Sequence, residues 1–586
     1  MDDTLGFSEQ EKKPSDDWHP GDTEESVSSV TSKICPHYQD LQVLQKNDFF
    51  LDRPQIPATY WERLSFFRSY ATSQTRTMFL CVQEEDFRVY LWNYLINVFF
   101  KSLPSTYVYA FLSAYVPDTH FFVAKIFPIA YGSTLAFIIT AFIDLIMVTY
   151  STTKYLDYLV LGFRYQSPWN RCSESFNITY KNTTLKCYEI QDFAKQFINK
   201  SVIFDDIVYI SEENEHFQLP QLLFYLSRMK YFQNCNVVLT CSYFVIFWLG
   251  ATITYPMFFK RFLWKTLHIA QMGLNMFLII VFVHLTIIYF ERGYKKYPVY
   301  RKELLDILQS SDFDLLSESM TTPPIVHILS SRSNIDKKPI QDSALIVTSN
   351  AVYYTFRGFV TYLLKLYCDN LANTSLQAIY FSSESLFYLW PIYFSQFYLG
   401  NLFTIVFFLL NLINEYLVIV ITVHCLIEAI LCEWRWLNTW ILIVSLSVLG
   451  VATFHFIPTE LIEIMYILCT ALMTLMELII IFYLYPLGRL VDDMTFFNGV
   501  RPTKLRIFTF WAAPVFYMLK IYYMITGLFK IVALTTLPQK YLYQYIYIPA
   551  VPMFFGALFA FFKYVIVKKM VTKNNQNMNL FKIISV

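Results

Sequence analysis

The chain has 586 residues, of which 55% are apolar, 19% aromatic and only 16% charged. A soluble globular protein carries roughly 25% charged residues, so this composition is typical of a membrane protein. The 46 Lys and Arg residues nearly balance the 45 Asp and Glu residues, and a net charge of +1 excludes a nucleic-acid-binding protein that relies on a basic surface. Ten cysteines without a C-x-x-C pair or a Cys/His cluster exclude a disulfide-dense scaffold and predict no metal site.

Residues 1–60 are acidic, rich in Ser and Thr and nearly free of apolar runs, which predicts a disordered tail. The segment has no basic stretch followed by an apolar core, so it is not typical of a cleaved signal peptide. We therefore expect this N-terminal tail to stay in the cytosol.

From Tyr90 onward, apolar segments near the length of about twenty residues that crosses a bilayer follow one another. The eleven predicted spans are approximately Tyr90–Val116, Ile126–Tyr150, Asn236–Met257, His268–Phe290, Ala344–Leu364, Ile379–Gly400, Leu402–Ile430, Trp440–Phe456, Ile462–Tyr485, Ile507–Leu528 and Tyr545–Val567. Hydropathy alone rejects a twelfth candidate, Trp61–Cys81, because four charged residues interrupt it.

The polar stretch 166–230 carries glycosylation sequons at Asn177, Asn182 and Asn199 beside a bridgeable pair, Cys172 and Cys187. Together these features predict a glycosylated, disulfide-bonded extracellular loop. With a cytosolic N-terminus, an odd number of spans must precede this loop. Only two strong spans precede the loop, so one more crossing is needed before it. Trp61–Cys81 is therefore predicted to be the first of twelve spans, shielded from lipid by its neighbours.

The basic residues of the short loops test this twelve-span topology, because they concentrate on the cytosolic side. Three groups fall there as expected: Lys260, Arg261 and Lys265; Arg489, Arg501, Lys504 and Arg506; and Lys563, Lys568, Lys569 and Lys573. Residues 61–567 then form the transmembrane domain, 291–342 a second large extracellular loop and 568–586 a cytosolic tail. A fourth sequon, at Asn373, falls in the predicted cytosolic loop between spans six and seven and is expected to stay unglycosylated.

Three segments resemble the neurotransmitter:sodium symporters, solute carrier family six. Phe163–Cys172, which contains Pro168-Trp169, is similar to the end of helix three and the start of the second extracellular loop in that family. Tyr485–Pro514 resembles its loop after helix ten, and Lys125–Gly132 its entry to helix three. The resemblance implies an all-α polytopic membrane protein of about twelve transmembrane helices with the LeuT-type inverted-repeat fold, binding substrate and sodium at mid-membrane.

The sodium sites implied by the resemblance depart from the family pattern. In the place of the glycine-rich helix one, the chain has a segment from Tyr70 in which Arg76 is one of the few matching residues. Predicted helix six has a single glycine, Gly358, and helix eight has Leu417 and Val418 where the family has an Asp-Ser pair. Because Leu and Val cannot coordinate a hard cation, the Na⁺ ligands appear lost from the sequence, and no metal ligand or other cofactor is assigned.

Ionisable residues inside predicted spans are candidates for function, because burying them in a membrane is costly. They are Asp144, His284, Arg357, Glu415, His424, Glu428 and Glu477. His424 and Glu428 are spaced as a proton-relay pair, or alternatively as a helix-end pair that reaches the cytosol. The resemblance implies that Arg76 is an outer-gate arginine with Glu460 or Glu463 as partner; an interfacial anchor is the alternative.

The predicted substrate site centres on Asp144. Counting back from Pro168-Trp169 without gaps places the family's substrate-contacting tyrosine at Val148, one helical turn after Asp144 on the same face. Tyr70 occupies the place of the carboxylate that pairs with amines in the family. Asp144 is therefore predicted to bind a cationic group of a ligand, and a salt bridge to Arg357 is the alternative.

The predicted function is secondary active transport of a small amino-acid-like or amine solute by alternating access, in the plasma membrane, with both termini cytosolic. The partners are the solute and the lipid bilayer, and neither a nucleic acid nor an enzymatic activity is expected. One alternative is a transport-inactive symporter-fold protein with a trafficking or binding role. The other is a membrane enzyme that uses the acidic pair Asp492-Asp493.

Overall fold

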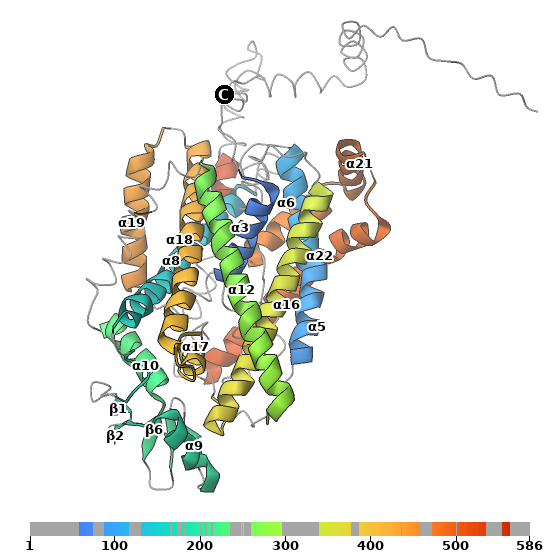
Figure 1. Ribbon diagram of the computed structural model, residues 1–586. Coiled ribbons are helices and arrows are strands. Elements are labelled where there is room, and N and C mark those ends of the chain that lie inside the picture. Colours follow the sequence, from blue (N-terminus) through green and yellow to red (C-terminus); the bar gives the residue numbers. More distant parts are fainter. Residues whose placement is uncertain are drawn as a thin grey trace, which may run out of the picture. The chain divides into compact units, whose positions relative to one another are not determined.

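The structure is a computed structural model in which all described elements belong to the unit Ile56–Val586 (Figure 1). It describes residues 58–73, 87–115, 130–164, 167–172, 179–180, 183–199, 202–205, 208–211, 215–234, 248, 250, 260–295, 339–376, 386–434, 436–456, 471–499, 501–534 and 554–562. The predicted N-terminal and C-terminal tails, 1–60 and 568–586, lie almost wholly outside these residues.

Helices dominate the described residues. The long ones are α8 (Tyr131–Gly162), α12 (Arg261–Arg292), α16 (Pro339–Ala372), α18 (Gly400–Glu433) and α22 (Lys504–Leu534). Shorter ones are α3 (Tyr60–Ser73), α5 (Phe87–Asn97), α6 (Leu103–Tyr115), α9 (Ile190–Asn199), α10 (Pro220–Asn234), α17 (Leu386–Phe394), α19 (Thr439–Phe456) and α21 (Leu487–Asn498). The π-helical turn η1 (Val98–Ser102) joins α5 to α6, and a second one, η5 (Ile480–Leu484), precedes α21.

Three of these helices, α8, α12 and α18, are long and apolar enough to cross a membrane. A fourth crossing is added if the bent pair Ala471–Leu484 and Leu487–Phe496, which meet at 89°, is counted as one span. The described residues therefore do not confirm twelve spans. They do show a helical membrane-type bundle at the positions predicted for spans three, five and eight.

The sequence of α12 explains how such a helix suits a bilayer. Its buried residues recur every three or four positions, as in Leu274, Leu278, Val281 and Leu285, and form one stripe against the bundle. Its opposite face exposes large apolar side chains such as Ile280, which is 65% exposed. Such a face is unfavourable in water and suits contact with lipid.

A small mixed sheet marks one end of the bundle. Its order is β3-β6-β5-β4, formed by β3 (Lys186–Cys187), β4 (Ile203–Asp205), β5 (Val208–Ile210) and β6 (His216–Gln218). Strands β1 (Thr179–Tyr180) and β2 (Thr183–Thr184) form an antiparallel pair beside it. We call this end, which also carries α9, the disulfide end, and the other the opposite end.

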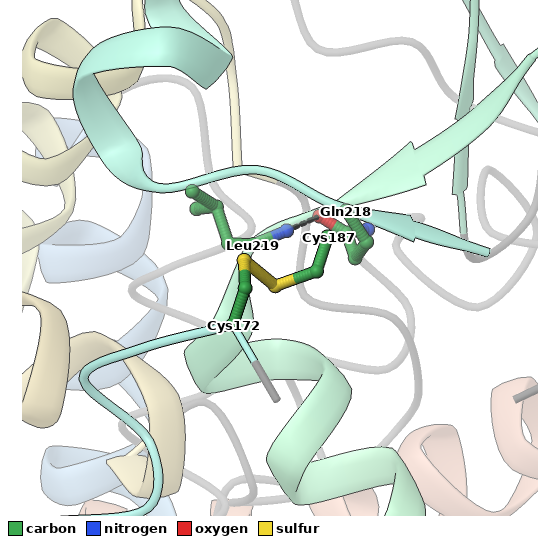
Figure 2. Close-up of a disulfide and its surroundings, with 4 residues drawn as sticks. All are labelled: Cys172, Cys187, Gln218 and Leu219. Carbon is green, nitrogen blue, oxygen red and sulfur yellow. Dashed lines mark hydrogen bonds between the residues drawn. A yellow bond between two sulfur atoms is a disulfide. The ribbon is translucent and has the colours of Figure 1, made fainter. Parts of the chain in front are cut away.

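The predicted disulfide between Cys172 and Cys187 is confirmed (Figure 2). It links the chain leaving α8 to β3, whose Cys187 lies across from Gln218 of β6. The side chain of Gln218 accepts a hydrogen bond from the backbone N–H of Leu219 at 3.0 Å. The crosslink thus fixes the sheet to the end of a membrane-type helix.

Helices α8 and α18 run antiparallel and pack together. At the disulfide end, a Cβ atom at Gly162 would lie 3.1 Å from Ile405 Cγ1, so the helices approach closely there. Close by, Ser167 Oγ donates to Asn401 Oδ1 at 2.8 Å. At the opposite end, Tyr131 of α8 shares an apolar cluster with Trp434, which follows α18.

The C-terminal end of α16 lies at the disulfide end, which corrects the predicted topology. Tyr209 Oη of β5 donates to the carbonyl of Ser375 at 2.6 Å, and Asn373 Nδ2 donates to the carbonyl of Ala194 in α9 at 3.5 Å. The backbone N–H of Lys295, just after α12, donates to Asn370 Oδ1 at 3.0 Å. The prediction that Asn373 lies in a loop on the other side of the membrane from Asn177 is therefore wrong.

Two further predictions change with α16. At 1.5 Å per residue this helix is about 50 Å long, so it begins at the opposite end, where Ile346 packs with Leu64 and Trp264. Of the predicted loop 291–342, residues 296–338 lie outside the described part, and the described residues on its two sides lie at different ends of the bundle. Of the predicted span Ile379–Gly400, the described part forms only α17, nine residues long and too short to cross.

The apolar sequence of α17 reflects burial inside the protein, not the membrane crossing that was expected. All nine of its residues are buried by protein, against α10, α16 and α18. Gly400 ends the turn that follows, where a Cβ atom would collide with the carbonyl of Phe394. Hydropathy does not distinguish burial in protein from burial in lipid, so the apolar sequence of α17 was wrongly predicted to cross the membrane.

Labelling of engineered cysteines tests the corrected topology. We expect Asn373→Cys and Lys195→Cys to react with a membrane-impermeant maleimide from the same side of the membrane. Trp436→Cys should react only from the other side, because Trp436 follows α18 at the opposite end and is 79% exposed. Reaction of Asn373→Cys from the side of Trp436→Cys would restore the original topology.

A buried ion pair fastens α10 to α8 and gives a stability prediction. Arg228 donates through Nε to Asp157 Oδ2 at 2.8 Å and through Nη2 to Oδ1, and the Asp157 side chain is 5% exposed. Asp157→Asn takes the charge of one partner from a guanidinium whose side chain is 23% exposed, a loss of about 1–3 kcal/mol, and we expect a clear drop in melting temperature. Asp192→Asn is the control, because its partner Lys195 is 69% exposed and such pairs contribute little. Equal melting temperatures for the two variants contradict this assignment.

Candidate functional site

Asp144 lies inside α8 and is 3% exposed, and Val148 on the next turn of the same face is 5% exposed. Val148 belongs to an apolar cluster that also contains Leu145 of α8 and Leu417 and Val418 of α18. The interface between α8 and α18 thus consists mainly of apolar side chains, with the Asp144 carboxylate set within the buried part of α8.

Two more charged residues join Asp144 from neighbouring helices. Arg357 of α16 is 4% exposed and Glu415 of α18 is 3% exposed. The carboxylate of Glu415 is attracted by the charge of Arg357 and repelled by that of Asp144. We call Asp144, Arg357 and Glu415 the charged cluster. It is the candidate site, because three buried charges from three helices interact there in a low-dielectric interior.

The charged cluster retains unused hydrogen-bonding capacity. Within the described residues, Arg357 Nε and Glu415 Oε2 are buried and have no hydrogen-bond partner. Arg357 also forms no direct ion pair with a carboxylate of the described residues, so the alternative of a closed Asp144–Arg357 salt bridge is not observed there. A guanidinium donor and a carboxylate acceptor that are both unsatisfied are costly to bury and can both bind a polar ligand.

Sequence reasoning missed two neighbours of the charged cluster, Lys154 and Tyr155. Lys154 is 5% exposed, and its Nζ lies 4.2 Å from the ring centroid of Tyr150. Tyr155 interacts electrostatically with Glu415, Arg357 and Lys154. The predicted span ended at Tyr150, so Lys154 was not among the ionisable residues considered inside spans. The helical repeat of apolar residues up to Gly162 was the signal that α8 continues.

An aromatic layer separates the charged cluster from the disulfide end. Tyr155 and Tyr158 of α8 contact Phe387 of α17 at ring-centroid distances of 5.1 Å and 5.2 Å. Phe408 of α18 stacks on Phe387 at 5.9 Å, and Trp169 stacks on Tyr158 at 5.3 Å. The short buried helix α17 therefore covers the cluster from that side.

The other ionisable candidates have partners of their own. Glu477 accepts a hydrogen bond from Tyr109 Oη, and His284 Nδ1 pairs with Tyr393 Oη at 2.8 Å. His424 Nε2 lies 3.9 Å from Glu428 Oε2, and the side chains of His424 and Glu428 are 2% and 11% exposed. None of these contacts places the four residues in the charged cluster.

Several predicted site residues lie outside the described part. These are the gate residues Arg76, Glu460 and Glu463 and the sequon residues Asn177 and Asn182. Tyr70 falls in α3 and Asn199 ends α9, but the description does not extend to their side chains. Their roles stay predictions.

Comparisons with known proteins bear on the fold. No protein-family model matches the chain, and no curated protein matches its sequence. Among solved structures, the chain is similar to the crystal structure of MhsT in complex with L-phenylalanine, with a TM-score of 0.57 and 12% sequence identity. The match covers 80% of this chain and 100% of that one. The chain therefore has the fold of a LeuT-type transporter, as the sequence resemblance implied.

Proposed function

We propose that the protein is a secondary active transporter of a small amino-acid-like or amine solute, which works by alternating access and whose sodium sites have lost their ligands. One observation carries the proposal: the buried charged cluster on α8, α16 and α18 lies inside a chain with the LeuT-type fold. Transporters of this fold bind substrate near the bilayer midplane. The MhsT structure, with its bound L-phenylalanine, supports an amino-acid-like solute.

The chemistry of the charged cluster suits a solute with an amino group and a carboxylate. Arg357 offers the donor geometry that pairs with a carboxylate, and Asp144 and Glu415 offer acceptors for an ammonium group. A zwitterion adds no net charge to the buried site, and its two groups satisfy polar atoms that are otherwise unpaired. An amine uses the carboxylates alone.

Alternating access needs a part that moves and a part that holds still. We assign α3, α5–η1–α6 and α16 to the moving bundle and α8 and α18 to the scaffold. Arg357 then belongs to the moving part, and Asp144 and Glu415 to the scaffold. A solute bridging these residues links the two parts, so its binding favours one arrangement over the other. We place the protein in the plasma membrane with the disulfide end outside.

A transport-inactive protein of the same fold is the second candidate, because Arg357 and Glu415 attract each other in the absence of solute. Uptake decides between the two. Proteoliposomes that contain the protein are tested with a panel of amino acids and amines. The proposal expects saturable uptake of at least one of them, above the uptake by liposomes without protein. Absence of uptake across the whole panel, with correctly folded protein, favours the inactive candidate.

Asp144→Asn tests the site within the transporter. We expect uptake of an amino-group-containing solute to fall at least about tenfold at normal surface expression, because an amide cannot neutralise the ammonium group. Asp492→Asn is the control, since Asp492 is exposed on α21 and belongs to the pair considered for a membrane enzyme. Unchanged uptake by Asp144→Asn, or equal losses in both variants, contradicts the assignment.

A further inference from the structure

An exposed stripe runs along α12 on the side turned away from the bundle. Its members follow one another at intervals of three or four residues and therefore share one face of the helix. They are Arg261, Lys265, Ile269, Met272, Met276 and Ile280. The four apolar members are 53–65% exposed, and the two basic members come first in the chain. We call this set the α12 stripe.

The two basic members of the α12 stripe receive little compensating charge from the protein. Arg261 Nε lies 3.7 Å from Glu62 Oε1 of α3, and the Arg261 side chain is 66% exposed. Glu62 is already engaged, because its Oε2 accepts a hydrogen bond from the backbone N–H of Thr59 at 2.7 Å. Lys265 is exposed and forms no ion pair with the residues that the structure describes. The stripe therefore begins with exposed positive charge.

A tryptophan of α3 lies beside this charged beginning. Trp61 is 59% exposed, and the residue after it, Glu62, is the one that contacts Arg261. One turn further along α3, Ser65 Oγ lies 2.5 Å from His268 Nδ1, which joins α3 to α12. Exposed tryptophans are typical of the level at which the polar headgroups of a bilayer meet its apolar core.

We propose that the α12 stripe binds an anionic phospholipid of the leaflet at the opposite end of the bundle. The lipid phosphate pairs with Arg261 and Lys265, and an acyl chain lies along Ile269, Met272 and Met276. The two cations, reinforced by the positive end of the helix dipole, favour a headgroup with a net negative charge. A zwitterionic headgroup brings an ammonium group that the same cations repel. The inference goes beyond the proposed transport function and does not depend on it.

The length of the stripe favours a lipid over a soluble anion. The rise along α12 from Lys265 to Met276 is about 16 Å, close to half the roughly 30 Å apolar core of a bilayer. One acyl chain of a single leaflet therefore matches the apolar part of the stripe down to Met276. A soluble phosphate ester pairs with the basic residues but leaves the apolar side chains uncovered.

Native mass spectrometry of the purified full-length protein tests the proposal. The protein in detergent is titrated with palmitoyl-oleoyl phosphatidylglycerol or with the phosphatidylcholine of the same chains, and the dissociation constant of the first bound lipid is measured. We expect the natural chain to bind the phosphatidylglycerol at least about fivefold more tightly, the factor expected for one basic residue near anionic lipid. Arg261→Gln/Lys265→Gln should bind the two lipids equally. Lys265→Gln alone, which breaks no ion pair, should weaken the preference.

A matched control removes two positive charges from the other end of the same helix. Arg292→Gln/Lys295→Gln changes exposed residues, and Arg292 lies on a different face from the α12 stripe, next to Glu291. We expect this variant to keep the preference for phosphatidylglycerol. Equal affinity of the natural chain for the two lipids overturns the proposal. A preference that survives Arg261→Gln/Lys265→Gln, or that falls equally in the control, also overturns it.

Glycerophosphoglycerol, the headgroup without acyl chains, separates a lipid from a soluble anion. We expect a large excess of it to leave the bound phosphatidylglycerol in place, because the acyl chain contributes its own contacts with the apolar part of the stripe. Displacement at concentrations similar to that of the lipid overturns the lipid as occupant and favours a soluble phosphate ester.

Discussion

The burial of three charges between α8, α16 and α18 is the constraint on which the rest of the structure depends. Each charge costs several kcal/mol to remove from water unless another charge or a hydrogen bond compensates it. Asp144, Arg357 and Glu415 come from three separate helices, so the charges of Arg357 and Asp144 act on the Glu415 carboxylate only while these helices keep their positions. A shift of α16 alone changes the balance of the whole charged cluster. In the proposed transporter, the same cluster links the packing of the bundle to the binding of a charged solute.

The disulfide end supplies the rigidity that this arrangement needs. The crosslink between Cys172 and Cys187 and the pair of Asp157 with Arg228 hold the sheet and α10 to α8. Tyr209 and Asn373 connect the sheet region to the end of α16, and α17 lies beneath, against the aromatic layer. The contacts of Tyr209 and Asn373 thus join the sheet region, which is fixed to α8, to the end of α16, so movement of α16 relative to α8 in the proposed cycle requires these contacts to change.

The sequence predicted the features that depend on local pattern. Long apolar runs placed α8, α12 and α18, and the spacing of cysteines in a polar loop gave the disulfide. The sequence-based prediction misplaced α16 and α17, because apolar content does not reveal whether protein or lipid surrounds a segment. In α16, polar residues such as Asn350 and Lys365 are buried among other helices, whereas α17 is wholly apolar and crosses nothing. The error at Asn373 followed from the assumption that α16 begins at the end of the bundle where α12 stops, whereas α16 ends there.

The candidate site was predicted only in part, for a related reason. Counting along α8 from Pro168 found Asp144, and Arg357 entered as a possible partner. Glu415 was one of seven ionisable residues inside predicted spans, and no sequence motif singled it out. Another of the seven, Glu477, is paired with Tyr109 in the structure. Which faces of α16 and α18 meet α8 is a property of tertiary packing. Proximity among the three charges therefore became visible only in the folded chain.

The central claim, that the charged cluster binds the solute, is tested most directly by an electron cryomicroscopy structure. The protein is reconstituted with the amino acid or amine that raises its melting temperature most. The account predicts solute density within hydrogen-bonding distance of Asp144 or Glu415, and of Arg357 when the solute carries a carboxylate. Solute density elsewhere, with Arg357 paired directly to a carboxylate of the protein, would contradict it.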